Sequence, residues 1–457
     1  MRRTIYVFGC AALLALVLIV APLLGDDRAA PASRAATAPL VRLYDEDPNH
    51  LWNRLHATIF KRMGFDGRTY GAHALDPLLW PSTRHLIDNP SNARLITLLD
   101  EFNGGGERLV RDPVKRATLQ RDLWAVFDWA VARRYPELTD DRAMRAAELS
   151  TRLAKAIQAL AMERARIGGL PDNYADAVAS GEIPAAFDPA HPDRPFLPPD
   201  LFDHAGPWVI IGEADGAARL HQQFFTRSVF HVALNLPGGR EATLAYLKQL
   251  GSVPKLWVDN PDYRPDASPA SRRDPLRYTP DLPQFPPGTH VALIRQSLLI
   301  DDQGRLVPSR LIESVQLRVY RRIVPSNPSE ATEDAPQAVF EWTLDRAALL
   351  AGRRGGLVPT KSDSIDFTLF MSHDLDPFEV RPHPGRRFTP PPSSLTSCMH
   401  CHNGPGVYSF QTFVQFQSPH VRPRSLYDTG ASSALSRAVD HKHERYDWGL
   451  LCGLMRE

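Results

Sequence analysis

VALIRQSLLI at residues 291–300, SVQLRVYRRIV at 314–324 and VFEWTL at 339–344 are the stretches that decide the fold. Each is rich in aliphatic, β-branched and aromatic residues, which favour extended strands. Asp301-Asp302-Gln303-Gly304 between the first two stretches is typical of a hairpin turn. An antiparallel sheet is therefore the simplest packing of these segments.

Further strand signals lie at 208–212 and 229–234, and a short helix is expected at 241–250. The proline-rich stretch 254–288 predicts a long surface excursion. Residues 367–370 predict one more strand before a second proline-rich stretch begins at 377. The middle of the chain is thus expected to be mostly β-sheet.

The preceding part of the chain has a helical pattern instead. Asp112-Pro113 predicts a helix N-cap followed by a first-turn proline. Two apolar stripes at helical spacing follow, and both predict core-facing helices: Leu119, Leu123, Val126, Phe127 and Ala130, then Leu149, Leu153, Ile157 and Leu160. The predicted class is α+β, with an N-terminal helical region, a central antiparallel β-sheet region and a short C-terminal segment packed on it.

The N-terminus has the pattern of an export segment. Arg2 and Arg3 precede an apolar run at 11–24, which predicts a signal peptide or an uncleaved membrane anchor. Residues 26–43, rich in Ala, Pro and Ser, predict a flexible linker. The expected organisation is signal or anchor 1–25, linker 26–43, helical domain 44–182, mostly β domain 183–376 and C-terminal segment 377–457.

Composition excludes several classes of protein. The 457-residue chain has a formal net charge of +1 and dispersed basic residues, so nucleic acid is not an expected partner. Its 4 Cys are too few for the disulfide framework of a small secreted domain. Stability is therefore expected to come from packing.

Cys398-Met399-His400-Cys401-His402 is the clearest chemical motif, a C-x-x-C-H run. Chance placement of 4 Cys and 16 His would produce this pattern in about one such chain in a thousand. Two thiols separated by two residues can reach one edge of a porphyrin, while the following histidine can turn back towards the metal.

On these five residues the chain resembles a c-type cytochrome. The resemblance implies one covalent haem c, thioether bonds to Cys398 and Cys401, and His402 as the proximal iron ligand. It further implies haem attachment on the extracytoplasmic side of a bacterial membrane, which agrees with the export segment. Together with residues 50–56 and the prolines near Phe196, the motif is also similar to uncharacterised exported bacterial proteins, a resemblance that carries no known activity.

The segment around the motif departs from a small cytochrome domain. The prolines at 390–392 prevent a helix from running into Cys398. Residues 407–416 alternate and predict a strand with Tyr408, Phe410, Val414 and Phe416 on one face. That strand would pack against a porphyrin or against another sheet.

The sixth iron ligand is not decided by the sequence. Met455 lies downstream, in the order that small cytochromes use, and is the predicted metal ligand beside His402. The other candidates are Met371, His373, His420, His441 and His443.

The expected function is one-electron transfer in a periplasmic redox assembly with an unidentified redox partner protein. The chain is expected to be periplasmic or membrane-anchored and facing the periplasm. An open sixth position would instead permit peroxidase chemistry, so enzymatic activity stays open. The alternative is a non-catalytic exported binding or scaffold protein. Its C-x-x-C-H segment would hold zinc, with Cys452 as a third thiolate, or a disulfide between Cys398 and Cys401.

Overall fold

The computed structural model describes residues 42–132, 140–212, 219–255, 257–266, 268, 275–280, 282–324, 335–361, 375–380, 395, 398–399, 402, 404–410, 427–428 and 430–456. All of them belong to one compact unit, residues 39–457. The predicted export segment at 1–25 lies outside the described residues. Within the described ranges, no helix is both long and apolar enough to cross a bilayer.

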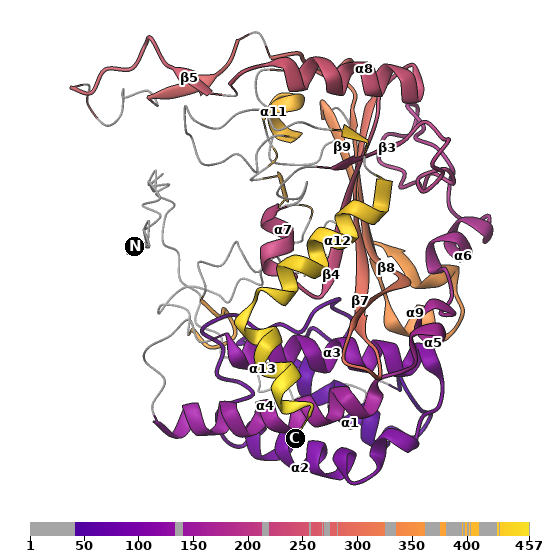
Figure 1. The fold of residues 1–457 in the computed structure, drawn as a ribbon, viewed down its shortest axis with the longest axis vertical. Coiled ribbons are helices and arrows are strands. Elements are labelled where there is room, and N and C mark those ends of the chain that lie inside the picture. Colours follow the sequence, from indigo (N-terminus) through magenta and orange to yellow (C-terminus); the bar gives the residue numbers. More distant parts are fainter. Residues whose placement is uncertain are drawn as a thin grey trace, which may run out of the picture. The chain divides into compact units, whose positions relative to one another are not determined.

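A seven-stranded antiparallel sheet forms the centre of this unit, in the order β10-β9-β8-β7-β4-β3-β11 (Figure 1). The strands are β3 (Val209–Gly212), β4 (Ser228–Asn235), β7 (Thr289–Ile300), β8 (Leu306–Tyr320), β9 (Gln337–Leu344), β10 (Leu357–Pro359) and β11 (Tyr427–Asp428). The predicted α+β class and the antiparallel sheet are confirmed. Strand β8 begins at Leu306 and ends at Tyr320, whereas the predicted stretch runs from 314 to 324.

The long hairpin of β7 and β8 turns at Asp301, as predicted. The backbone N–H of Asp301 donates to the carbonyl of Arg305 at 2.9 Å, and Gly304 takes a φ of 71°, which a residue with a Cβ rarely adopts. The side chain of Gln120 bonds both backbone groups of Ile300, at 2.9 Å and 3.0 Å. The turn end of the hairpin is thereby attached to the helical region.

Four helices make up most of the helical region: α1 (Leu51–Phe60), α2 (Ser91–Asn103), α3 (Pro113–Val131) and α4 (Asp140–Leu160). Asp112 caps α3 by accepting from the backbone N–H of Lys115 at 2.9 Å, so the predicted cap is confirmed. Both predicted apolar stripes are buried. One core joins them to Ile300, Leu306 and the C-terminal residues Trp448 and Leu451.

The two faces of the sheet pack against different parts of the chain. One face packs on Phe196, Leu201 and α6 (Asn173–Ala179). The opposite face presents Phe230, Val291 and Tyr320 to α8 (Gly239–Ser252) and α11 (Val407–Phe410). Helix α12 (Gly430–His443) contacts β3 and β4 (Figure 1).

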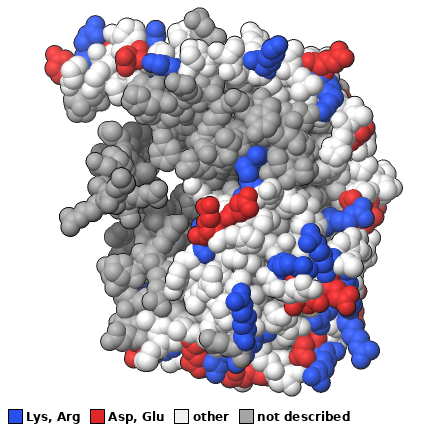
Figure 2. All heavy atoms as spheres, viewed as in Figure 1, with Lys and Arg blue, Asp and Glu red and all other residues white. Residues whose placement is uncertain are grey.

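The remaining short elements connect these layers. They are β1 (Arg62–Met63), β2 (Thr69–Tyr70), η1 (Gly106–Arg108), α5 (Arg164–Gly168), α7 (Arg219–Phe224), β5 (Trp257–Asp259), β6 (Leu276–Tyr278), α9 (Arg346–Leu350), η2 (Arg354–Gly356) and α13 (Tyr446–Leu454). The pair β5 and β6 forms a small antiparallel ribbon inside the proline-rich excursion. On the face drawn in Figure 2, acidic and basic side chains are interspersed.

One prediction near the motif is wrong. Residues 407–410 form the helical turn α11 and not the start of a strand. Gly406 takes a positive φ of 52°, and its carbonyl accepts from the backbone N–H groups of Ser409 and Phe410. These bonds close a turn that the aromatic alternation of the sequence does not reveal. Residues 411–416, and the strand predicted at 367–370, lie outside the described residues.

Candidate functional site

Cys398 lies over the sheet face formed by β8. It has helical conformation and a buried side chain, and the amide Nε2 of Gln316 donates to its Sγ at 3.1 Å. The backbone N–H of His402 donates to the carbonyl of Cys398 at 3.0 Å, which closes one helical turn between the two residues. Cys401 lies outside the described residues. The structure thus brings Cys398 and His402 together on one turn of backbone.

The ring of His402 is fixed by one short hydrogen bond. Nδ1 lies 2.7 Å from the backbone carbonyl oxygen of Ser409, so this nitrogen carries the proton and Nε2 carries the lone pair. Burial, reinforced by the positive charge of Arg318, holds the pKa of His402 well below its usual value. A neutral imidazole whose other nitrogen is held by a carbonyl is the form in which histidine binds metals.

The carbonyl of Ser409 is itself held in place. The Ser409 hydroxyl lies 2.7 Å from the Tyr320 hydroxyl and donates to the carbonyl of Gly406 at 2.8 Å. Gln284 anchors the same turn, accepting from the N–H of Val407 at 2.7 Å. The orientation of His402 therefore depends on a turn that is hydrogen-bonded to Tyr320 of β8.

Arg318 is a buried cation beside the motif. Its Nη2 donates to Gln316 Oε1 at 2.7 Å, and the same amide contacts Cys398 through Nε2. Only 6% of Arg318 is exposed. Within the described ranges, no carboxylate forms an ion pair with it. Burying a guanidinium away from a counter-charge costs free energy, and the bonds to Gln316 Oε1 offset part of that cost.

His221 lies over the same face. It belongs to α7, which is attached to β4 by a hydrogen bond of 2.8 Å from Gln222 Nε2 to the carbonyl of Ser228. The His221 ring packs on Phe230 with 5.5 Å between ring centroids. Burial, together with the charges of Arg318 and Arg295, lowers the pKa of His221 to about 4. No motif marks this histidine in the sequence.

Met455 is placed elsewhere. It packs against the helical core, and its Cε lies 3.8 Å from the position that a Cβ would take at Gly304. Gly304 and Gln316 are separated by roughly 40 Å along the hairpin strand, at about 3.3 Å per residue. The structure does not bring Met455 to His402, because the last helix returns to the helical region.

The other candidate metal ligands also lie away from the motif or outside the described residues. Cys452 on α13 packs against the helical core, where burial raises the pKa of its thiol, so it does not join Cys398. The ring of His443 packs on Trp448, at 5.7 Å between ring centroids. Met371, His373 and His420 lie outside the described residues. In the part of the chain that the structure describes, no three His, Cys, Asp or Glu side chains are grouped as metal ligands.

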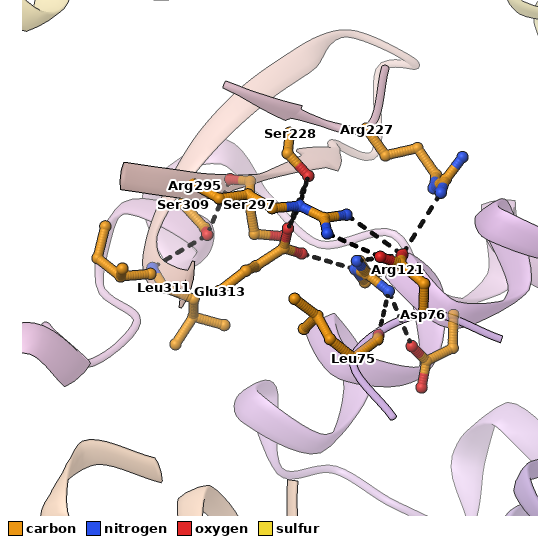
Figure 3. Close-up of polar contacts among 12 residues, drawn as sticks. Leu75, Asp76, Arg121, Arg227, Ser228, Arg295, Ser297, Ser309, Leu311 and Glu313 are labelled. Atoms are coloured by element: carbon orange, nitrogen blue, oxygen red, sulfur yellow. Dashed lines mark hydrogen bonds and ion pairs between the residues drawn. The ribbon is translucent and has the colours of Figure 1, made fainter. Parts of the chain in front are cut away.

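A buried network of ion pairs connects β7 and β8 to the helical region (Figure 3). Arg121 contacts Asp76 and Glu313, each at 2.6 Å, and Arg295 contacts Asp76 at 2.7 Å. Burial raises the pKa of Asp76, but the three guanidinium groups around it outweigh that effect and hold the pKa well below its usual value. The Arg295 guanidinium also lies over the rings of Phe225 and Phe230, at 4.3 Å and 5.8 Å. Arg295 thereby links Phe225 and Phe230, which pack near His221, to Asp76 of the helical region.

A cavity of about 130 Å³ borders this network. Asp76, Asp128, Arg227 and Asp447 are among its lining residues. The charges there are largely paired with one another, since Arg227 contacts Asp128 at 3.0 Å and Arg445 contacts Asp447 at 3.1 Å. The cavity and its network are features that the sequence analysis missed, because charged pairs distant in sequence leave no local pattern.

Comparisons with family models, with curated proteins and with solved structures find no match for this chain.

Proposed function

We propose that this protein is an exported c-type haem protein that transfers single electrons. The haem would be attached to Cys398 and Cys401, with His402 as the proximal ligand. The observation that carries the proposal is the hydrogen bond of 2.7 Å between His402 Nδ1 and the Ser409 carbonyl. It selects the neutral tautomer whose Nε2 can donate to iron, as in other metal-bound histidines.

The residues around the motif fit such a group. Gln316 positions the Cys398 thiol, and the Ser409 carbonyl orients the His402 ring. Arg318 would neutralise a carboxylate of the ligand, which accounts for a buried guanidinium without a carboxylate partner in the described ranges. A bound haem iron changes between its ferric and ferrous states and so supplies one-electron chemistry.

The expected location agrees with this chemistry. The export pattern at 1–25 predicts delivery across the membrane, where the resemblance to c-type cytochromes places covalent haem attachment. The proposed protein is therefore periplasmic, or anchored with its folded part in the periplasm. A redox partner protein would deliver or accept the electron.

The proposal is tested by expressing the full chain with its export segment and cytochrome-maturation machinery. A denaturing gel stained for haem reports covalent attachment, and an absorption spectrum of the reduced protein reports a c-type haem. A mature, exported protein without haem would overturn the proposal. It would direct attention to zinc content and to the oxidation state of Cys398 and Cys401.

A further inference from the structure

His221 and the C-x-x-C-H turn lie over neighbouring positions of one sheet face. Phe230 of β4 pairs with Arg295 of β7, and Arg295 pairs with Ser314 of β8. Residues paired directly across antiparallel strands share a face, and residues two apart on one strand share it too. The side chains of Phe230 and Gln316 therefore point to the same side of the sheet. The His221 ring packs on Phe230, and Gln316 donates a hydrogen bond to Cys398.

The separation of the two positions suits a ligand held between them. Phe230 and Gln316 are two strands and two residues apart, which corresponds to roughly 12 Å between their Cα atoms. His221 lies above the first position and the motif above the second. Arg318 lies close enough to both histidines for its charge to act on each ring.

Other described histidines lack this placement. His231 follows Phe230 on β4 and so points to the opposite face, where its Nε2 lies 2.8 Å from Gln296 Oε1. His290 of β7 packs on Phe196 and Trp208, also on the opposite face of the sheet. His443 is exposed, and its ring packs on Trp448. Among these histidines, His221 is the one that shares the face of Cys398.

We propose that His221 is the second axial ligand of the haem, opposite His402. This inference rests on the proposed function and specifies the type of site. A neutral imidazole of His221 would donate its lone pair to the iron. This coordination transfers no proton and changes no oxidation state. Two histidine ligands fill both axial positions, which favours electron transfer over the binding of peroxide to the iron.

The test is spectroscopic and uses the haem-loaded full chain. Ferric wild-type protein should give a low-spin electron paramagnetic resonance signal, and the reduced protein should not bind carbon monoxide readily. His221→Leu should keep covalent haem on a denaturing gel but become high-spin and bind carbon monoxide. Added imidazole should restore the low-spin signal of this variant.

Two further variants guard against a purely structural effect. His221→Met keeps a ligand of different chemistry, so it should stay low-spin while its reduction potential rises above that of the wild type. His231→Gln changes a histidine on β4 that points to the opposite face of the sheet, so it should leave the spin state unchanged.

A low-spin signal that persists in His221→Leu would overturn the assignment of His221 and indicate another ligand. High-spin wild-type protein with covalent haem would overturn it as well, while leaving the proposed haem attachment intact. Wild-type protein without covalent haem would overturn both proposals.

Discussion

Nζ of Lys442 lies 2.9 Å from Oδ2 of Asp128, although the lysine side chain is completely buried. The same ammonium group contacts Asp447 at 3.1 Å and lies 5.1 Å from the centroid of the Trp124 ring. Lys442 belongs to α12, Asp128 to α3 and Asp447 to α13. A single cation thus joins the C-terminal helices to the helical region.

Lys442→Met is expected to lower the free energy of unfolding by about 3 kcal/mol, because it leaves two buried carboxylates with one cation fewer. Denaturant unfolding followed by circular dichroism measures the change. Arg152→Met is the matched control, since Arg152 pairs with Asp100 at the surface and its loss should cost less than about 1 kcal/mol. Equal losses in the two variants would show that the buried lysine has no special role.

Protonation of His56 is expected to make the fold sensitive to acid. Burial, with the charge of Arg346, lowers the pKa of His56 to about 3, while the unfolded chain has the ordinary value of 6.5. Below pH 6.5 the unfolded state binds a proton that the folded state does not, so stability falls as the pH drops towards 3. This residue alone should cost up to about 1.4 kcal/mol per pH unit.

The pH dependence of unfolding in His56→Gln measures this contribution. The variant keeps a side-chain donor for the Ala72 carbonyl, which lies 3.1 Å from His56 Nε2. Between pH 6.5 and 5 its stability should fall less steeply than that of the wild type. Identical slopes for both proteins would mean that His56 titrates normally in the fold.

Arg318→Gln is expected to lower the reduction potential of the haem. A cation near the iron favours the ferrous state, and losing about 1 kcal/mol of this stabilisation shifts a one-electron potential by roughly 40 mV. Protein film voltammetry or a redox titration measures the shift. Arg310→Gln is the control, because Arg310 lies on the same strand but pairs with Asp172 at the surface. An unchanged potential in Arg318→Gln would remove Arg318 from the haem site.

Gly406→Ala is expected to reduce haem retention and to destabilise the fold by about 1–3 kcal/mol. A Cβ there would meet Gln284 Oε1 at 2.1 Å, and the positive φ of 52° disfavours any side chain. The substitution would displace the turn whose Ser409 carbonyl orients His402. Haem content per polypeptide and thermal unfolding measure both effects.

Gly453→Ala is the matched control, since a Cβ at Gly453 meets nothing within 4 Å in α13. It should retain full haem content and should be slightly more stable, because alanine favours a helix more than glycine does. Full haem content in Gly406→Ala would contradict the role assigned to this turn.

The sheet could be predicted because its signal is local. Residues 291–300 and 339–344 have the residue types of strands, and both form strands with nearly the expected bounds. The Asp112 cap is equally local. Residues 407–410 were less predictable. Three of these four residues are β-branched or aromatic and suit a strand as well as a helix, and a hydrogen-bonded turn at Gly406 decides between the two.

The site could be predicted only in part. Cys398 and His402 belong to a compact motif, so their proximity follows from spacing. His221 carries no motif, and its place depends on the packing of α7 against Phe230. Arg318 could be recognised only after β8 was known to point it towards a buried face. The position of Met455 downstream of the motif favours it as a ligand, but chain order does not reveal that α13 returns to the helical core.

Covalent attachment of one haem to Cys398 and Cys401 can be measured from the intact mass of the exported, purified protein. The same measurement is made on the Cys398→Ser, Cys401→Ser and Cys452→Ser variants. We expect the wild type and Cys452→Ser each to carry the mass of one covalent haem and to give a c-type spectrum. Loss of either motif thiol should abolish the normal attachment through two thioethers. Wild-type protein with the mass of the polypeptide alone, colourless after complete export and maturation, would contradict the proposed haem attachment.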